Sequence, residues 1–332
     1  MKTVRASAPG KLMFAGEYSV VDGSAPSLAV AVDGRVTVSV TPGGERWRVT
    51  SPSMELDEAP VGDVPVVDAA VADCSGLPQG GLVSISTELP VGAGLGSSAA
   101  LCVAAVGALR ALAGLDAPTV EDVVRVHRAA QGGVGSGYDV ATCLLGGVVR
   151  FELVHDEPKA ERLAWPQGLA YAVLTSGLKA STVALVERVR AWREAKGDEA
   201  ERWVVPMGAR AREVAEAFAL GESPAILDAV ANAEEALVAM DRAGAIGLMP
   251  RTHAELKAAV EDAGAYARTS GAGGGDCVWA LSPDPAVIAA AVEAVRGLGF
   301  APVEAAISER GLEVEGLDSV LPAAGEGESG GA

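Results

Sequence analysis

The chain has 332 residues, 49% of them hydrophobic, which is enough for one large domain or two modest domains with a substantial core. Its formal net charge of −18 argues against nucleic acid or an anionic membrane surface as a partner. No uncharged apolar run approaches the roughly 18 residues of a membrane span, and the opening MKTVRASAPGK lacks a signal-peptide core, so we expect a cytoplasmic protein.

Cysteine and histidine usage argues against two further kinds of site. The four cysteines lie far apart with no CxxC spacing, which favours reduced thiols over a disulfide framework. The three histidines are too dispersed for a zinc cluster. If the ligands of so acidic a chain are anions, the positive potential must be local. Its sources would be helix N-termini, backbone amides, a few cationic side chains or a metal ion.

The hydrophobic pattern of the first half predicts alternating strands and helices. Runs rich in β-branched residues favour strands, and a run of small residues that is apolar nearly all round favours a buried helix. Thr119 and Asp122 are spaced as a capping box at the start of a second helix. In chain order we expect strands at 27–40 and 82–88, helices at 97–113 and 120–130, and a strand at 148–153.

A proline- and charge-rich stretch at 155–168, HDEPKAERLAWPQG, predicts a junction between two domains. We therefore expect an N-terminal domain at 1–160, a C-terminal domain at 161–316 and a flexible tail at 317–332. In the second half we expect a strand at 170–175, a helix with apolar residues at 183, 186, 189 and 192, helices at 208–219, 224–243 and 252–263, a strand at 277–282, a helix at 285–297 and a strand at 300–307.

The segment PVGAGLGSSAA, at 90–100, has the features of a phosphate-binding loop. It follows an expected strand and opens an expected helix, where free amides and the helix dipole favour anions. Its glycines remove side chains, so backbone amides can approach a ligand closely. It is not a Walker A loop, because no Gly-Lys-Ser/Thr follows. A tight turn into a buried helix, or a loosened dinucleotide fingerprint with Asp116, would also fit this segment alone.

Three further segments carry candidate chemistry. SGAGGGD, at 270–276, is a glycine-rich loop between two expected strands, and a flexible hairpin turn is its alternative. GVGSGYD, at 133–139, places a carboxylate directly after a glycine-rich turn. SAPGKLMFAGEYSVVDG, at 7–23, places Lys11 beside an apolar run, where a fully solvated charge is less comfortable.

In order and spacing, these four segments together resemble the GHMP kinases, the superfamily named for galactokinase, homoserine kinase, mevalonate kinase and phosphomevalonate kinase. The resemblance covers about 300 residues. It implies a two-domain α+β fold, with an N-terminal domain like ribosomal protein S5 domain 2 and a ferredoxin-like C-terminal domain. The active site would lie in the cleft between them.

Within the superfamily, three details resemble the phosphomevalonate kinases. GEYSVVDG carries Tyr18 where mevalonate kinases typically have His. GSGYDVAT replaces their Pro-Ser-Gly-Val-Asp-Asn pattern, and Asp276 stands where many relatives have Gly. A helix Glu that binds metal in mevalonate kinases would fall near Arg128 here, which puts that mode of metal binding in doubt. The implied reaction is ATP-dependent phosphorylation of (R)-5-phosphomevalonate to the diphosphate.

The resemblance also implies roles for particular residues, with ATP and a small-molecule acceptor as partners, Mg²⁺ as cofactor and a homodimer as the candidate assembly. Lys11 and Asp139 would be catalytic, and Ser98 would help to hold Mg²⁺. The nucleotide phosphates would lie on Pro90, Gly92, Gly94, Leu95, Gly96, Ser97, Ser98 and Ala99. Substrate-binding candidates are Glu17, Tyr18, Ser136, Gly137, Lys179, Ser181, Thr182, Ser270, Gly271, Ala272, Gly273 and Gly274.

Three other interpretations stay open from the sequence. A mevalonate kinase with unusual motifs is one. A non-catalytic GHMP-like ligand sensor is another, although such a protein need not keep Lys11, Ser98 and Asp139. A Rossmann dehydrogenase is the third, but it leaves SGAGGGD and APGK unexplained, and the glycine loop follows some 80 residues of other structure rather than the first strand.

Overall fold

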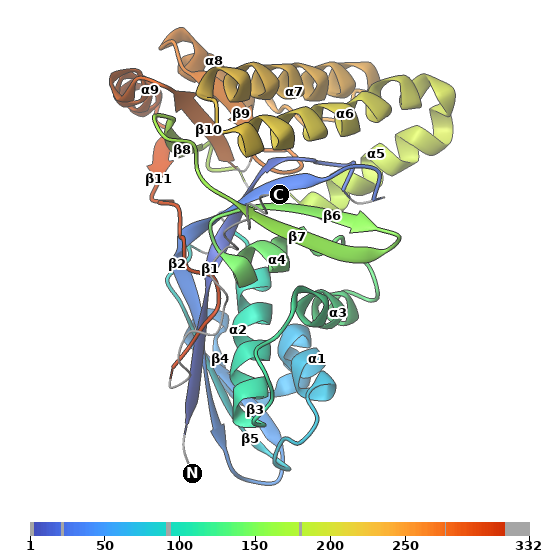
Figure 1. Ribbon diagram of the computed structural model, residues 1–332, viewed down its shortest axis with the longest axis vertical. Coiled ribbons are helices and arrows are strands. Elements are labelled where there is room, and N and C mark those ends of the chain that lie inside the picture. Colours follow the sequence, from blue (N-terminus) through green and yellow to red (C-terminus); the bar gives the residue numbers. More distant parts are fainter. Residues whose placement is uncertain (1–2, 21–22, 91–93, 179–180, 276, 316–332) are drawn as a thin grey trace, which may run out of the picture.

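The computed structural model describes residues 3–20, 23–90, 94–178, 181–275 and 277–315, which form two β-sheets with helices packed on each (Figure 1). The larger sheet has the strand order β12-β1-β2-β5-β3-β4, and β6 pairs with both β2 and β7. Its strands are β1 (Val4–Ala15), β2 (Ser27–Pro42), β3 (Trp47–Ser51), β4 (Leu56–Pro60), β5 (Gly81–Thr87), β6 (Val148–Val154), β7 (Glu157–Leu163) and β12 (Glu313–Val314).

The smaller sheet has the order β11-β8-β10-β9, and all of its pairings are antiparallel. Its strands are β8 (Ala170–Thr175), β9 (Tyr266–Thr269), β10 (Cys277–Ser282) and β11 (Ala301–Val303). In the larger sheet only β3 and β5 pair in parallel. This arrangement is not the parallel, doubly wound sheet that a Rossmann dehydrogenase requires, so that alternative is wrong.

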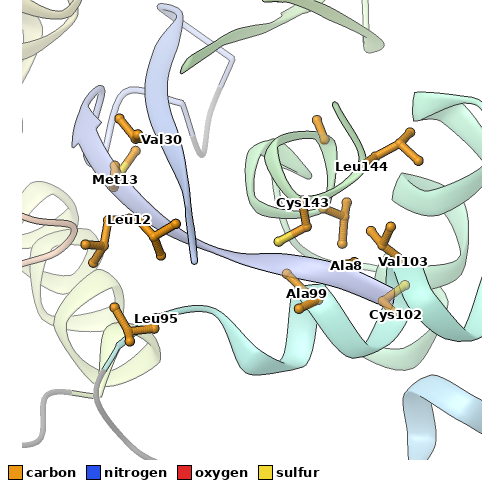
Figure 2. Packing of buried hydrophobic residues seen from close by; sticks show 14 of the residues in the cluster. Ala8, Leu12, Met13, Val30, Leu95, Ala99, Cys102, Val103, Cys143 and Leu144 are labelled. Atoms are coloured by element: carbon orange, nitrogen blue, oxygen red, sulfur yellow. The ribbon is translucent and has the colours of Figure 1, made fainter. Parts of the chain in front are cut away.

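Four helices lie on one side of the larger sheet (Figure 1). They are α1 (Pro65–Asp73), α2 (Ser97–Leu112), α3 (Val120–Ala130) and α4 (Tyr138–Leu145). As its composition predicts, α2 is buried along most of its length. Its residues Ala99, Cys102 and Val103 pack against β1 and α4 (Figure 2). Small side chains on α2 allow this close approach, which places the start of α2 beside β1.

The remaining helices come from the second half of the chain. These are α5 (Thr182–Lys196), α6 (Asp198–Leu220), α7 (Ser223–Gly244), α8 (Arg251–Asp262) and α9 (Pro285–Gly297). Helices α7, α8 and α9 contact the smaller sheet, whereas α6 contacts β1 and β2 of the larger sheet. Helices α6 and α7 lie side by side, while α8 and α9 pack near the small sheet (Figure 1). No helix among the described residues has both the length and the apolar character needed to cross a membrane.

An aromatic cluster joins the two sheets. Phe14 of β1 makes edge-on contacts with Phe218 of α6 and Trp279 of β10, with ring centroids 4.9 and 5.4 Å apart. Trp165, which follows β7, stacks on Trp279 at 6.1 Å. Such pairs add stability beyond the area they bury, so the two halves of the molecule share one continuous core.

Two connecting segments differ in detail from the elements expected for them. The stretch expected as a domain junction forms β7, which pairs with β6 through a turn at His155 and Asp156, both of which have positive φ. Residues of β7 alternate between exposed and half-buried, and this pattern with Lys and Pro is typical of an edge strand. The larger sheet therefore continues past the expected boundary at 160 to Leu163.

The strand expected at 300–307 is divided between the two sheets. Only Ala301–Val303 pairs in the smaller sheet, as β11. The chain then crosses to the larger sheet, where Ile307 forms a bridge with Val32 of β2. Residues 313–314 finally pair with β1 as β12, so the end of the described chain completes the N-terminal sheet.

Candidate active site

A cleft of about 410 Å³ lies where segments from both halves of the molecule meet. The cleft is lined by β1 and the loop that follows it, by the starts of α2, α4 and α5, and by the end of α3. The glycine-rich segment that begins at Ser270, called the second glycine loop below, completes the lining. Its lining residues are Lys11, Leu12, Met13, Glu17, Tyr18, Val20, Pro90, Gly94, Leu95, Gly96, Ser97, Ser98, Ala99, His127, Gln131, Tyr138, Asp139, Thr182, Val186, Ser270, Gly271 and Ala272.

The first glycine loop is attached directly to β1. The amide of Lys11 donates to the carbonyl of Leu95 at 2.9 Å. Gly96 adopts a φ of +75°, and a Cβ at this position would lie 2.8 Å from the side-chain carbons of Lys11. A glycine is therefore needed here both for the left-handed backbone and for the passage of the lysine side chain into the cleft.

The amino end of α2 is open to an anion. Its N-cap is Gly96, no side chain caps the helix, and its first turn contains no acidic residue. Free amides and the positive end of the helix dipole therefore face the cleft at Ser97, Ser98 and Ala99, as an anion site requires.

Lys11 meets Tyr138 and Asp139 on the first turn of α4. Its Nζ lies 5.5 Å from the centroid of the Tyr138 ring. Burial alone would lower the pKa of Lys11, but interactions with Tyr138 and Asp139 outweigh that effect and raise its pKa above the ordinary value. The lysine therefore carries a full positive charge beside the open end of α2.

Asp139 is held by contacts to one of its two oxygens. Oδ1 accepts a hydrogen bond from the amide of Val140 at 2.9 Å, and Nδ1 of His127 lies 3.6 Å from the same oxygen. Among the described residues, no hydrogen bond reaches the other oxygen, Oδ2. One carboxylate oxygen is therefore left for a ligand in the cleft.

Two hydrogen bonds join the end of β1 to the second glycine loop. Tyr18, a non-glycine residue with a φ of +65°, donates its hydroxyl to the carbonyl of Ala272 at 2.5 Å. Ser270 donates its hydroxyl to the carbonyl of Met13 at 2.9 Å. The two segments therefore form one wall of the cleft.

Behind this wall lies a buried network of acidic and basic side chains. Arg268 is fully buried, and its guanidinium donates to Glu17, to Glu234 at 2.7 Å and to the carbonyl of Phe14 at 3.0 Å. Although burial opposes its charge, the two carboxylates raise the pKa of Arg268. For Glu234, burial alone would raise the pKa, but the nearby charges of Arg268 and Lys257 lower it to about 2.

Comparison with known proteins fits this geometry. Residues 66–147 match the model of the GHMP kinases N terminal domain, and residues 224–299 match that of the GHMP kinases C terminal domain. A mevalonate kinase of Thermococcus gammatolerans is 31% identical over 94% of this chain and 98% of its own. The chain belongs to the GHMP kinase family.

Two further similar proteins are phosphomevalonate kinases. The phosphomevalonate kinase of Streptomyces sp. strain CL190 is 29% identical to this GHMP kinase, over 84% of this chain and 90% of its own. The structure of Streptococcus pneumoniae phosphomevalonate kinase with phosphomevalonate and AMPPNP superposes with a TM-score of 0.74. That match has 21% identity and covers 90% of this chain and 98% of the other, which supports the shared fold.

Family membership confirms the two-domain fold expected from the sequence and makes this GHMP kinase a phosphotransferase. The structure brings most of the expected site residues to one cleft. They are Lys11, Glu17, Tyr18, Pro90, Gly94, Leu95, Gly96, Ser97, Ser98, Ala99, Asp139, Thr182, Ser270, Gly271 and Ala272. Gly92, Lys179 and Asp276 lie outside the described residues.

Five expected ligand-binding residues of this GHMP kinase do not line the cleft. Ser181 caps α5 by accepting from the amide of Ala184. The remaining four shape loops. Gly137 permits close contact between the start of α4 and α3, and the carbonyl of Ser136 accepts from Arg128. Gly273 and Gly274 pack against the backbone of Leu248, to whose carbonyl Gly274 also donates.

Two residues in the lining are committed to protein partners. The carboxylate of Glu17 is paired with Arg268, and the hydroxyl proton of Tyr18 is used by Ala272. The Tyr18 hydroxyl therefore cannot donate to a substrate phosphate, and the Glu17 carboxylate accepts from Arg268, so we interpret both as residues that position the wall.

Several cleft residues were not identified from the sequence. His127, Gln131 and Tyr138 reach the cleft from α3 and α4. For Tyr138 a local signal existed, since it precedes Asp139 on the same first turn. His127 and Gln131 are one helical turn apart, which is the only sequence sign that they share a face.

Proposed function

We propose that this GHMP kinase transfers the γ-phosphoryl group of ATP to (R)-5-phosphomevalonate. The observation that carries this proposal is that the amino ends of three helices line the same cleft, through Ser97 of α2, Tyr138 of α4 and Thr182 of α5. The first turn of α4 contains Asp139, whereas the first turns of α2 and α5 contain no acidic residue. Two helix ends are thus suited to two separate anionic groups.

The end of α2 supports the assignment of the nucleotide site. Its open amides and the hydroxyls of Ser97 and Ser98 suit the β- and γ-phosphates. No group of three or more His, Cys, Asp or Glu side chains is placed to bind a metal within the described residues. Ser98 is the residue that we assign to a magnesium ion, together with the phosphates, and the ion when bound would neutralise charge on them.

The end of α5 supports a phosphorylated acceptor. A phosphate monoester brings roughly two negative charges at neutral pH, which a protein of net charge −18 must balance locally. Thr182 and the amides of the first turn of α5 that Ser181 does not cap are suitable donors, and Lys179 precedes them in the sequence. Tyr18 fixes the wall next to this region.

Lys11 and Asp139 are the proposed catalytic residues. Phosphoryl transfer passes through a loose transition state, so positioning and charge neutralisation contribute most of the rate. Lys11 is charged and lies beside the amino end of α2, where it would stabilise charge on the transferring group. Asp139 would orient the acceptor and take a proton from it where the acceptor carries one.

Mevalonate is the second candidate acceptor. It is favoured by the Thermococcus gammatolerans relative, a mevalonate kinase that matches almost the whole chain. Purified enzyme with ATP and Mg²⁺ should be offered mevalonate and phosphomevalonate separately, and the products identified by mass. We expect the diphosphate from phosphomevalonate with far higher kcat/KM. Comparable values for the two acceptors would contradict the proposal, and absence of ADP release with a wider acceptor panel would favour a non-catalytic sensor.

A further inference from the structure

His127 lies on the last turn of α3, is 3% exposed, and lines the cleft beside Asp139. We propose that His127 is a positioning residue: its neutral Nδ1–H tautomer points at Oδ1 of Asp139 and holds that carboxylate so that Oδ2 faces the acceptor. The proposal deepens the function above and rests on it for its kinetic part.

The partners of the imidazole determine which nitrogen carries the proton. Nε2 of His127 lies 3.1 Å from the amide nitrogen of Gln131. An amide N–H can only donate, so Nε2 accepts and the proton lies on Nδ1. If the amide were reversed, Nε2–H would donate to its oxygen. An unprotonated Nδ1 would then face the carboxylate of Asp139, lone pair against lone pair, at 3.6 Å. The orientation in which the Gln131 amide donates to Nε2 avoids this repulsion, and it places the proton on Nδ1.

The fold fixes the distance between the two residues. A Cβ at Gly137, the N-cap of α4, would lie 2.5 Å from the side chain of Val124 on α3. The absence of that Cβ allows the start of α4 to rest on α3. His127 follows Val124 by one turn, and Asp139 is on the first turn of α4, so this close contact brings imidazole and carboxylate together.

A second set of bonds ties the intervening loop to the same helix. Arg128 donates to the carbonyl of Gly135 at 2.8 Å and to that of Ser136 at 3.2 Å. At the other end of α3, Thr119 and Asp122 form a reciprocal capping box. The helix that carries His127 and the loop that leads to Asp139 are thus held as one unit.

The contact has a chemical consequence for Asp139. Its Oδ1 is shared between the amide of Val140 and His127, so rotation of the carboxylate would break two interactions at once. At 3.6 Å the His127 contact is longer than a good hydrogen bond, and contacts of this kind often tighten when the reacting groups assemble. Loss of the imidazole would leave the carboxylate with a single local partner and a wider range of orientations.

Two substitutions separate positioning from packing. His127→Asn keeps an N–H close to the position of Nδ1, whereas His127→Leu keeps the volume and removes the donor. We expect the leucine variant to lose about tenfold in kcat with phosphomevalonate, with the KM for ATP little changed. The asparagine variant should recover most of that loss. In an Asp139→Asn background, His127→Leu should cost little more, because the two residues act as a unit.

The tautomer itself is measured on wild-type protein by ¹⁵N chemical shifts of the imidazole, which do not depend on any substrate. A protonated Nδ1 with an unprotonated Nε2 supports the proposal, whereas an imidazole protonated at both nitrogens contradicts it. An Nε2–H tautomer overturns it, as do wild-type kcat in His127→Leu or losses that add to those of Asp139→Asn. If the enzyme phosphorylates neither mevalonate nor phosphomevalonate, the proposed function fails, whereas the NMR result still decides the orientation of His127.

Discussion

The guanidinium of Arg268 and the carboxylate of Glu17 form an ion pair across 251 positions of the chain, and both side chains are almost completely buried. Glu17 follows β1 of the larger sheet, whereas Arg268 belongs to β9 of the smaller one. The same guanidinium donates to the carbonyl of Phe14 at the end of β1. The pair thus joins the two sheets directly behind the wall of the cleft.

Breaking this pair from one side should destabilise the protein strongly. Arg268→Met leaves two buried carboxylates without their main counter-charge, and we expect a loss of about 3–5 kcal/mol in the free energy of unfolding. Glu17→Gln, which keeps a hydrogen-bond acceptor and leaves Arg268 paired with Glu234, should cost less. Urea titrations of the three proteins give the comparison. Equal losses in both variants would contradict a network in which Glu234 shares the guanidinium.

Gly96→Ala should reduce catalysis by displacing Lys11. The new Cβ would lie 2.8 Å from the lysine side chain, in addition to the strain of a φ of +75°. Gly44→Ala is a matched control, because Gly44 has a φ of +78° and nothing within 4 Å of its Cβ position. Both should lose stability through the shared backbone strain, whereas only Gly96→Ala should lose turnover, toward the roughly 10²–10³-fold drop expected for Lys11→Met. Wild-type kcat in Gly96→Ala would remove the contact from the mechanism.

Asp139→Asn should distinguish the two candidate acceptors. The hydroxyl of mevalonate must lose its proton, so its phosphorylation should fall by about 10²–10⁴-fold without the carboxylate. The phosphate of phosphomevalonate, whose second pKa is about 6, is already largely ionised at neutral pH, so the loss should stay below about 10²-fold. Steady-state kcat at pH 7.5 or so with each acceptor tests this. An equal loss for both would mean that Asp139 acts mainly through the charge of Lys11.

Thr182→Glu should weaken binding of a phosphorylated acceptor. A carboxylate at the amino end of α5 opposes the helix dipole and repels a phosphate there, which corresponds to about a tenfold rise in KM. The KM for ATP should change much less, because its phosphates are assigned to α2. Thr182→Val, which removes the hydroxyl without adding charge, separates the two effects. A larger rise for ATP than for phosphomevalonate would reverse the assignment of the two helix ends.

Stability should fall as the pH is lowered from 6.5 towards 4, partly because of His253. This residue is buried on α8, and burial lowers its pKa to about 4, compared with about 6.5 in the unfolded chain. Between these values the unfolded state binds more protons than the folded state, so acid favours unfolding. Glu234 and Lys257 face the same region, and Glu234, with a pKa of about 2, stays ionised throughout this window.

The contribution of His253 can be isolated by substitution. Its Nε2 lies 3.2 Å from Oγ1 of Thr269, whose own hydroxyl donates to Glu234, so Nε2 is the donor. His253→Gln retains an N–H near that position but does not titrate. The free energy of unfolding from urea titrations should differ less between pH 7 and pH 4.5 in this variant than in the wild type, by up to about 2 kcal/mol. An unchanged difference would show that His253 is not buried as a neutral group.

Sequence reasoning succeeded where the determining interactions are local. The capping box at Thr119 and Asp122 and the small-residue helix α2 depend on neighbours within a few residues, and both are present in the structure. Helix α6 begins at Asp198 rather than near 208, because the helix continues through Pro206 instead of starting after it. The alternation in β7 was overlooked because proline and charge suggested a linker.

The parts of the site that were not predicted depend on residues distant in the sequence. Nothing near Arg268 indicates that Glu17 is its partner, and the pair forms only when β9 reaches the end of β1. The contact between His127 and Asp139 depends on a glycine that allows two helices to touch. Motifs therefore identified the segments that meet in the cleft, whereas the pairing of side chains within it required the tertiary structure.

Because the chain returns to β1 near residue 313, the order of synthesis determines when the larger sheet can be completed. The amide of Ser308 donates to the carbonyl of Ala31, the amide of Leu312 donates to that of Leu144, and β12 pairs with β1. The edge of the larger sheet is thus covered by residues that are synthesised after the whole smaller domain. During translation, this edge of β1 therefore stays unpaired until residues 308–314 have been synthesised, and the sheet is completed only after the smaller domain has been made.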